Sequence, residues 1–295
     1  MKKILILGSG GFIGRNLYEY LSENTNYSIS APSSLELNAA DENSVTKYLK
    51  HGCFDIVIHS AIYNPRTDEK KDQNKELEYD LRMFFNFEKN QHLFGKMFYL
   101  GSGAEFDKKE PMIEILESDF PRTIPGSDYG LAKYIINKQI QKSTNIYNLR
   151  IFGLFGKYEN WKKTFISGAC CKALKNIPIT IRRNVYFDYL FIDDFCEILI
   201  RLIENKQNFR DYNICTGNKI DLLSIAEIIK KVSGKMVPIF ICEEGYANEY
   251  TANNCRLLTE LNNFEFMPIE HSIGSLYTYY KENEEMIDLI SLLYS

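Results

Sequence analysis

The sequence opens with a short apolar run that leads directly into a glycine-rich segment. Residues 4–7 are Ile-Leu-Ile-Leu, and glycines follow at positions 8, 11 and 14. The apolar run predicts a buried strand, and residues 16–21 have the periodicity of an amphipathic helix. A strand, a glycine loop and a helix in this order bring backbone amides and a helix N-terminus to a pyrophosphate. The opening therefore predicts a dinucleotide site, although an ordinary strand-to-helix turn also favours glycine.

The first half of the chain continues as an alternation of strand and helix patterns. This alternation predicts an α/β fold, a Rossmann-like doubly wound parallel sheet with right-handed crossovers. After residue 152 the order loosens, and no Pro/Gly/Ser-rich linker divides the chain. We therefore expect a Rossmann domain over residues 1–155 and a smaller C-terminal α/β lobe over residues 156–295, with the chain crossing back to the sheet. The expected strands are 28–31, 55–61, 96–100, 147–151, 179–181 and 190–192; the expected helices are 42–49, 74–91, 128–143, 161–175, 193–204, 222–232 and 272–282.

Composition excludes several classes of partner. The net charge of −4 disfavours nucleic acid and anionic membranes, both of which attract basic surfaces. No stretch approaches the ~20 apolar residues of a membrane span, and the N-terminus has no apolar signal-peptide region. The seven cysteines form no CxxC pair, and the four histidines have no ligand spacing with them. We expect a cytoplasmic protein with free thiols and no metal site.

Ligands of such sheets bind beyond the carboxyl ends of the strands. This rule gathers residues 8–14, 60–63, 101–104 and 152–156 around one crevice. A further segment, Tyr129-Gly130-Leu131-Ala132-Lys133, lies on a predicted helix that places the phenol and the ammonium one turn apart.

A lysine at this spacing would stabilise a tyrosine phenolate. A unit charge at ~4 Å contributes about 4 kcal/mol at an effective dielectric near 20, or roughly three pKa units. A tyrosine tuned in this way exchanges a proton with an alcohol or carbonyl oxygen while a hydride moves to or from nicotinamide. Spacing alone does not identify the pair, because exposed helical pairs also have it. The same spacing occurs at Tyr134/Lys138, Tyr158/Lys162 and Tyr277/Lys281.

Small neighbours at Gly130 and Ala132, and a hydroxyl at Ser102 on the preceding strand end, distinguish Tyr129 from the other three tyrosines. With these features the chain resembles the extended short-chain dehydrogenases/reductases of the nucleotide-sugar epimerase/dehydratase family over essentially its whole length. The matching segments are residues 8–14, 55–61, 100–106, 129–133, 149–156 and 188–194.

The resemblance implies an NAD(P)-dependent nucleotide-sugar oxidoreductase with a catalytic triad. Ser102 would hydrogen-bond the reacting oxygen, and Tyr129 would be the general acid/base. Lys133 would tune Tyr129 and hold the nicotinamide ribose. The alternative for Ser102 is a turn serine that closes a strand. The cofactor contacts implied are Gly8, Gly11, Phe12, Ile13, Gly14, Ser33, Asn38, Ser60, Ala61, Tyr129 and Lys133.

Two departures from the family pattern narrow the reaction. The 4,6-dehydratases have an Asp-Glu pair where this chain has Gly103 and Ala104. The acid Glu105 of this chain lies one position beyond the place of that pair. GDP-fucose synthases have a Cys and a His where this chain has Ala104 and Tyr158. What remains is Ser102, Tyr129 and Lys133, the minimal set for hydride transfer at a carbonyl. This set predicts NADPH-dependent reduction of a nucleotide-activated 4-keto (6-deoxy) sugar, in the synthesis of surface-polysaccharide precursors. The alternatives are an NAD-dependent C4 epimerase and, in another class, a non-catalytic dinucleotide-sensing protein.

The coenzyme and substrate segments also depart from the family. NAD-preferring members end the second strand with an acid, whereas this chain has Ala31-Pro32-Ser33-Ser34. These serines, helped by Arg15, would bind a 2′-phosphate, which favours NADP(H) over NAD(H); the alternative is an ordinary polar loop.

Phe187 replaces the family's diphosphate-binding arginine, and Arg183 or Arg256 is the candidate substitute. The Asp193-Asp194 pair predicts a helix N-cap followed by a first-turn acid, not a catalytic dyad. Helices near residues 76–91 and 128–143 match those that pair family dimers, so we expect a homodimer. The nucleotide, the sugar and the product stereochemistry do not follow from the sequence.

Overall fold

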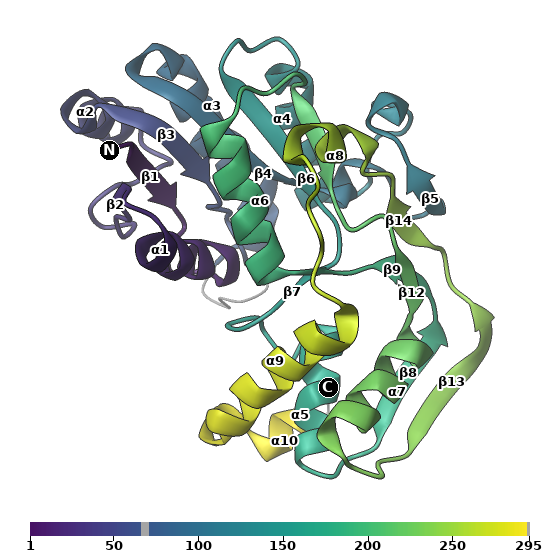
Figure 1. The fold of residues 1–295 in the computed structure, drawn as a ribbon. Coiled ribbons are helices and arrows are strands. Elements are labelled where there is room, and N and C mark those ends of the chain that lie inside the picture. Colours follow the sequence, from purple (N-terminus) through teal and green to yellow (C-terminus); the bar gives the residue numbers. More distant parts are fainter. Residues whose placement is uncertain (66–70, 294–295) are drawn as a thin grey trace.

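The computed structural model describes residues 1–65 and 71–293. Its centre is a six-stranded sheet in which every neighbouring pair is parallel (Figure 1). The chain moves from β1 outward to β2 and then back past β1 to β3, so the strand order reverses beside β1. This confirms the predicted Rossmann-like α/β fold and puts a ligand crevice at the ends of β1 and β3. The order is β11 (Asp211–Ile214), β6 (Ile146–Ile151), β4 (Phe94–Ser102), β3 (Phe54–His59), β1 (Lys3–Leu7) and β2 (Ser28–Ser30).

Helices cover both faces of this sheet because its strands are apolar on both sides. Ile4 and Ile6 of β1 face one core, shared with α1 (Phe12–Asn24) and α6 (Ile192–Glu204). Leu5 and Leu7 face the opposite core. The helices on that side are α2 (Glu42–Gly52), α3 (Glu76–Lys89) and α4 (Asp128–Ile140).

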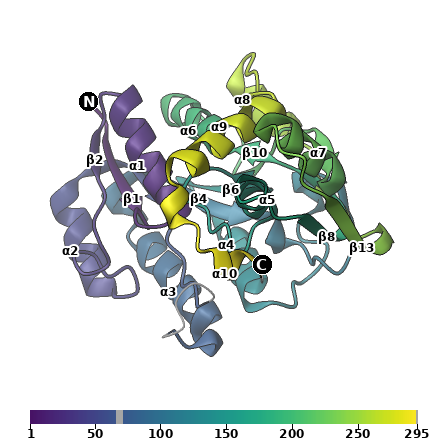
Figure 2. The same cartoon turned by 90° about the horizontal axis from the view of Figure 1, so that it is seen from below.

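The C-terminal half forms a smaller lobe and also returns to the main sheet through β11. In the lobe, β8 (Ile179–Asn184) pairs in parallel with β13 (Ile239–Tyr246). Three helices pack together beside them (Figure 2): α5 (Phe165–Leu174), α7 (Leu222–Ser233) and α9 (Ile269–Glu282).

A second small sheet joins the two halves of the chain, because its edge strand β5 (Met112–Ile115) comes from the first half. The other strands, in order from the far edge, are β12 (Lys219–Asp221), β9 (Tyr186–Asp188) and β14 (Tyr250–Ala252). The remaining strands and α-helices of the described residues are β7 (Leu154–Phe155), β10 (Leu190–Phe191), α8 (Cys255–Leu261) and α10 (Leu289–Leu293).

Five helix starts differ from the sequence prediction. Helices α3, α5 and α9 begin at residues 76, 165 and 269, and not at residues 74, 161 and 272. Helix α1 begins at Phe12, inside the glycine segment, and not at residue 16. Helix α6 begins at Ile192 with Phe191 as its N-cap, so the predicted Asp193 cap is wrong, and both aspartates lie in the first turn. Asp194 accepts a hydrogen bond from the Met267 amide at 3.0 Å instead. In the described residues no helix is both long and apolar enough to cross a bilayer.

Candidate active site

The glycine loop is tightly packed between β1 and β3. Gly8 has φ +77°, and a Cβ there would lie 2.9 Å from the Ala61 Cα. A Cβ on Gly14 would lie 2.2 Å from the Gly8 carbonyl oxygen and 2.9 Å from the Ser60 hydroxyl. Both contacts are too close for any side chain, so the loop requires glycine at these positions. The packing brings the predicted residues Ser60 and Ala61 against the glycine loop.

The N-terminus of α1 is suited to an anion. Gly11 is the N-cap, so no side chain occupies the cap, and residues 12–15 include no acid. The first amides of a helix lack partners within the helix, and the helix dipole favours negative charge there. The Gly11 amide donates to the Gly8 carbonyl at 3.0 Å, so the amides that this helix start would offer an anion are those of Phe12 and Ile13.

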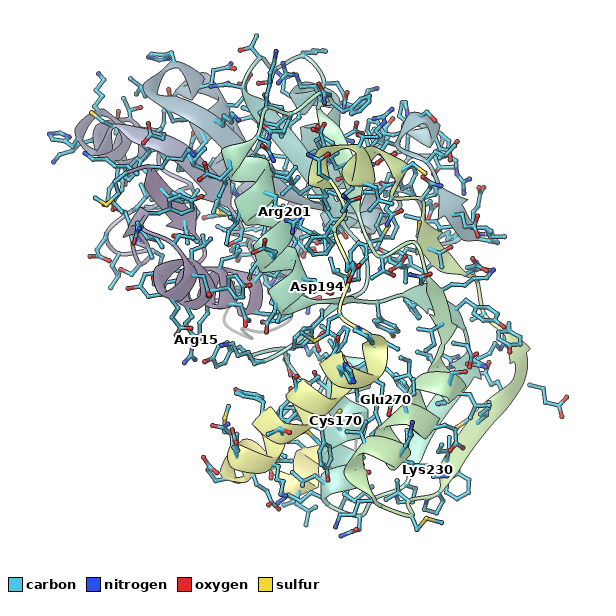
Figure 3. All side chains as sticks on the ribbon, in the orientation of Figure 1. Arg15, Cys170, Asp194, Arg201, Lys230 and Glu270 are labelled. Carbon is cyan, nitrogen blue, oxygen red and sulfur yellow. The ribbon has the colours of Figure 1, made fainter. Side chains whose placement is uncertain are left out.

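The residues predicted to bind a 2′-phosphate have other partners. Ser33 donates both its amide and its hydroxyl hydrogen to Glu36 Oε2, each at 2.8 Å. These bonds hold the pKa of the exposed Glu36 carboxyl below its usual value. Arg15 pairs with Glu19 at 3.1 Å and stacks on the Tyr158 ring at 3.7 Å; Figure 3 shows it projecting from α1. Ser33 is therefore bound to a carboxylate, which sequence reasoning missed.

Asn38 also has partners within its loop. Its amide hydrogen is donated to the Ser44 hydroxyl at 3.2 Å, and its side-chain oxygen accepts from the Ala40 amide at 3.1 Å. These bonds shape the turn that leads into α2, next to the end of β2.

The predicted catalytic residues come from β4 and α4. Ser102 is the last residue of β4, and its Oγ accepts a hydrogen bond from the Ala104 amide at 3.2 Å. Tyr129 lies in the first turn of α4, which the Ser127 side chain caps. Lys133, one turn further, donates from Nζ to the Leu100 carbonyl at 2.7 Å, two residues before the serine. The bond fixes the ammonium between α4 and β4.

The environment of Lys133 distinguishes it from the other three lysines at the same spacing. Its Nζ lies 5.5 Å from the centre of the Tyr129 ring, the same distance as Lys138 from Tyr134. Lys133 is only 2% exposed, whereas Lys138, Lys162 and Lys281 are exposed. Burial lowers the pKa of Lys133 to about 8. The negative charges of Asp80 and Glu105 act in the opposite direction and partly offset this decrease.

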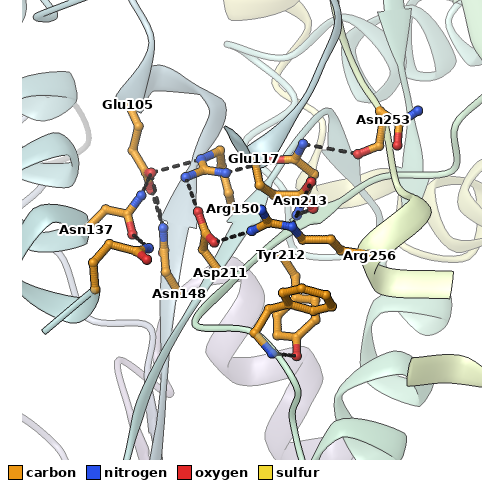
Figure 4. A network of polar contacts seen from close by, with 12 residues as sticks. Glu105, Glu117, Asn137, Asn148, Arg150, Asp211, Tyr212, Asn213, Asn253 and Arg256 are labelled. Carbon is orange, nitrogen blue, oxygen red and sulfur yellow. Dashed lines mark hydrogen bonds and ion pairs between the residues drawn. The ribbon is translucent and has the colours of Figure 1, made fainter. Parts of the chain in front are cut away.

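Glu105 belongs to a buried polar network (Figure 4). Its carboxylate accepts from Arg150 Nε at 2.8 Å and from the side-chain amides of Asn137 and Asn148, each at 2.8 Å. It also accepts from the Ser102 amide at 3.3 Å. The carboxylate that follows Ser102 along the chain is therefore held by the core network.

The model of the NAD dependent epimerase/dehydratase family matches residues 4–215. The chain belongs to this family. Membership confirms the resemblance found in the sequence and the predicted class of enzyme, an NAD(P)-dependent oxidoreductase of the nucleotide-sugar epimerase/dehydratase type.

Individual relatives of this epimerase/dehydratase family member are distant. It is 37% identical to GDP-L-colitose synthase of Yersinia pseudotuberculosis over 59 residues, 20% of this chain and only 19% of that protein. It is 24% identical to the spore coat polysaccharide biosynthesis protein SpsK of Bacillus subtilis over 254 residues, 84% of this chain and 86% of that protein.

Solved structures share the fold at lower identity. A GDP-L-fucose synthetase from Naegleria fowleri has a TM-score of 0.84 at 16% identity, covering 96% of this chain and 94% of that one. MlghC, a GDP-mannoheptose C4 reductase from Campylobacter jejuni with NADP bound, has a TM-score of 0.76 at 17% identity, covering 95% and 98%.

A pocket of about 510 Å³ lies between the smaller lobe and the segment after Ser102. Phe187, the predicted replacement of the family arginine, lines it together with Tyr250 and the cations Lys108 and Arg183. Arg183 also pairs with Glu243 at 2.8 Å. The other candidate, Arg256, is instead bound to Asp211 at 2.7 Å, within the buried network.

Proposed function

We propose that this family member is an NADPH-dependent reductase of a nucleotide-activated 4-keto (6-deoxy) sugar, acting in the synthesis of surface-polysaccharide precursors. The main support for this proposal is the position of the buried Lys133. Its ammonium lies between the Leu100 carbonyl and the Tyr129 ring, and Ser102 stands nearby at the end of β4. Gly103 and Ala104 leave this set without further acids or bases for dehydration or C3/C5 epimerisation. A GDP-mannoheptose C4 reductase and a spore coat polysaccharide protein among the similar proteins support the proposal.

The residues present fit a nicotinamide dinucleotide. The glycine loop and the open N-terminus of α1 would hold the pyrophosphate, and Lys133 with Tyr129 would hold the nicotinamide ribose. The bound cofactor supplies the hydride for the keto carbon. The NADP bound in the GDP-mannoheptose C4 reductase supports NADPH as the coenzyme of this chain. The Glu36 carboxylate is evidence against NADPH, because it would repel a 2′-phosphate at Ser33.

The protein's part in the reaction is to polarise the keto oxygen and protonate it. Ser102 donates a hydrogen bond to the oxygen, and Tyr129 transfers its phenolic proton to that oxygen as the carbon receives the hydride. Lys133 stabilises the phenolate that is left, because its buried ammonium lies beside the ring. The keto group thereby becomes a hydroxyl, with one hydride and one proton gained.

We further propose that the pocket of about 510 Å³ binds the nucleotide part of the substrate. Lys108 and Arg183 would neutralise the diphosphate, and the apolar Phe187 wall would take the place of the arginine contact. Both arginines pair with carboxylates, but Arg183 lines this pocket, whereas Arg256 is held in the network by Asp211 and Glu117 and does not line it. Binding energy from this nucleotide handle would position the sugar at Ser102 and Tyr129.

A cytoplasmic homodimer completes the proposal. Helices α3 and α4 lie side by side on the outer face of the sheet, joined by the Gln139–Glu88 hydrogen bond at 3.0 Å. Pairing with the same two helices of a second copy would form a four-helix interface.

An NAD-dependent C4 epimerase is the second candidate, and the Ser33–Glu36 contact favours it. A carboxylate at the ribose end of β2 accepts hydrogen bonds from a diol and repels a phosphate. The same triad would then oxidise and re-reduce the sugar.

The deciding assay follows NADPH absorbance with GDP-, dTDP-, CDP- and UDP-linked 4-keto-6-deoxy sugars. Stoichiometric NADPH loss with one member supports the reductase and names the nucleotide. A change of sugar configuration at constant absorbance supports the epimerase. No change with any member, while a control reductase consumes its own sugar from the panel, refutes the proposal.

Tyr129→Phe tests the catalytic assignment. Turnover should be abolished because the proton donor is lost, while NADPH binding is retained because the glycine loop, the start of α1 and Lys133 would still hold the cofactor. Tyr134→Phe is the matched control, since it lies on the same helix with its lysine at the same 5.5 Å. Near-normal turnover of Tyr129→Phe would refute its role.

A further inference from the structure

The Glu105 carboxylate connects two elements of the candidate site, the end of β4 and helix α4. Its Oε1 accepts a hydrogen bond from the Ser102 amide at 3.3 Å, and its Oε2 accepts from the Asn137 side-chain amide at 2.8 Å (Figure 4). Asn137 is fully buried and lies one helical turn beyond Lys133 and two turns beyond Tyr129, on the same face of α4. One side chain is thus hydrogen-bonded to both the serine segment and the tyrosine helix.

We propose that Glu105 is a positioning residue of the reaction, whose carboxylate sets the distance between the Ser102 hydroxyl and the Tyr129 phenol. This inference rests on the proposed reduction, in which both groups act on one keto oxygen. The serine comes from β4 and the tyrosine from α4, so the spacing of strand and helix decides whether both reach that oxygen at once. Catalysis depends steeply on such geometry, because a misplacement of about 1 Å can cost about 100-fold in rate.

Two other contacts hold α4 against the same segment. Lys133 Nζ donates to the Leu100 carbonyl at 2.7 Å, before the serine along β4. A Cβ on Gly130 would lie 2.6 Å from the Ala104 carbonyl oxygen, so the helix also touches the turn after the serine. The hydrogen bond to the carboxylate adds a third contact, one turn further along α4. Two contacts leave the helix free to rotate about the line that joins them, whereas three separated contacts fix its orientation.

Neighbouring strands hold the carboxylate in place. From β6, Asn148 Nδ2 and Arg150 Nε each donate to it at 2.8 Å. Arg150 is fully buried, and its Nη2 atom lies 3.0 Å from Asp211 Oδ2 on β11. A buried carboxylate with this many donors has little freedom to move, so it places α4 relative to the central sheet.

Asn137→Ala removes the bond between α4 and the carboxylate and leaves the Glu105–Arg150 ion pair intact. We expect kcat to fall about tenfold, equivalent to about 1.4 kcal/mol, with an unchanged KM for the sugar. KM should not change because other residues line the proposed nucleotide pocket. An unchanged kcat would overturn the proposal.

Asn213→Ala is the matched control, because Asn213 is also a fully buried asparagine of the network. Its side chain accepts from Arg150 Nη1 at 2.8 Å and donates to the carbonyls of Ile115 and Asn253, at 2.9 and 3.1 Å. This variant should lower Tm at least as much as Asn137→Ala, yet retain the wild-type kcat when rates are expressed per folded enzyme. An equal loss of kcat in both variants would show a general structural effect and overturn the proposal.

A double-mutant cycle with Ser102→Ala adds a readout that a merely structural role would not change. Without the serine hydroxyl there is no second group to align with the phenol. Adding Asn137→Ala to Ser102→Ala should therefore cost much less than tenfold in kcat. The same tenfold loss in both backgrounds would overturn the proposal.

A measurement without turnover separates this inference from the proposed function. In ¹⁵N-labelled protein, the Ser102→Ala variant identifies the Ser102 amide resonance, and Asn137→Ala should shift that resonance through the shared carboxylate. No shift would overturn the inference, even if a sugar is reduced. A shift in a protein that reduces no sugar of the panel would instead support the link between β4 and α4 and refute the proposed function.

Discussion

Replacing Glu105 by Gln should destabilise the protein by about 3–5 kcal/mol, the usual cost of breaking a buried ion pair from one side. The side chains of Glu105 and Arg150 are both fully buried, and their Oε2 and Nε atoms are 2.8 Å apart. Glutamine preserves the shape and removes the charge. Among the described residues, Arg150 would then retain Asp211, at 3.0 Å, as its ionic partner.

The hydrogen-bond pattern supports a value in this range. Glu105 accepts from Ser102, Asn137, Asn148 and Arg150, and it donates to none of them. A glutamine amide would direct its own N–H₂ at some of these donors, which leaves buried groups unsatisfied at about 1–3 kcal/mol each. The expected loss is therefore several times that of an exposed ion pair.

The chain contains a matched exposed pair, Lys89–Glu42. Its atoms are also 2.8 Å apart, but both side chains are 56% exposed. Solvent screens this attraction, so Glu42→Gln should cost less than about 1 kcal/mol. The same substitution at the same distance thus isolates the effect of burial.

Urea unfolding followed by circular dichroism measures both variants. A Glu105→Gln loss within about 1 kcal/mol of the Glu42→Gln loss would refute the reasoning. It would mean that the network relaxes or admits water when the charge is removed.

Three further outcomes are expected. Gly14→Ala should lower Tm, because its Cβ would lie 2.2 Å from a backbone oxygen, while Gly10→Ala, with nothing within 4 Å, should not; equal Tm values would contradict this. Burial raises the pKa of Glu159 to about 7, so wild-type stability should fall as pH rises from about 4.5 through 7. Glu159→Gln should flatten that part of the Tm–pH curve, and an unchanged slope would contradict it. Glu36→Gln should raise the NADPH/NADH ratio of kcat/KM by removing the carboxylate beside Ser33; an unchanged ratio would place Glu36 away from the ribose.

The sheet and its helices could be predicted because local patterns determine them. Residues 4–7 alternate between two buried cores, and the glycines that follow are required by the close approach of β3. The strands of the smaller lobe could not be predicted as easily. β13 is mostly exposed, and β14 has three residues whose partners come from distant parts of the chain.

The candidate site likewise combines residues that could be predicted from the sequence with residues that could not. The Tyr129/Lys133 spacing is visible in the sequence, but three other pairs share it, and only tertiary burial separates Lys133 from Lys138. Tyr250 belongs to no motif, because its position beside Ser102 depends on a strand that pairs across the two halves of the chain.

The segment Gly101–Glu105 shows why fold and site are difficult to separate in this protein. A Cβ on Gly101 would lie 2.1 Å from the Asn148 side-chain oxygen, so the network side of Ser102 admits no side chain there. A Cβ on Gly103 would lie 2.3 Å from the Tyr250 hydroxyl, so the substrate side admits none either. Glu105 then ties the turn to Arg150. The serine thus lies between a buried charge network and the half-buried phenol of Tyr250, and each of its two glycine neighbours is required by one of these contacts.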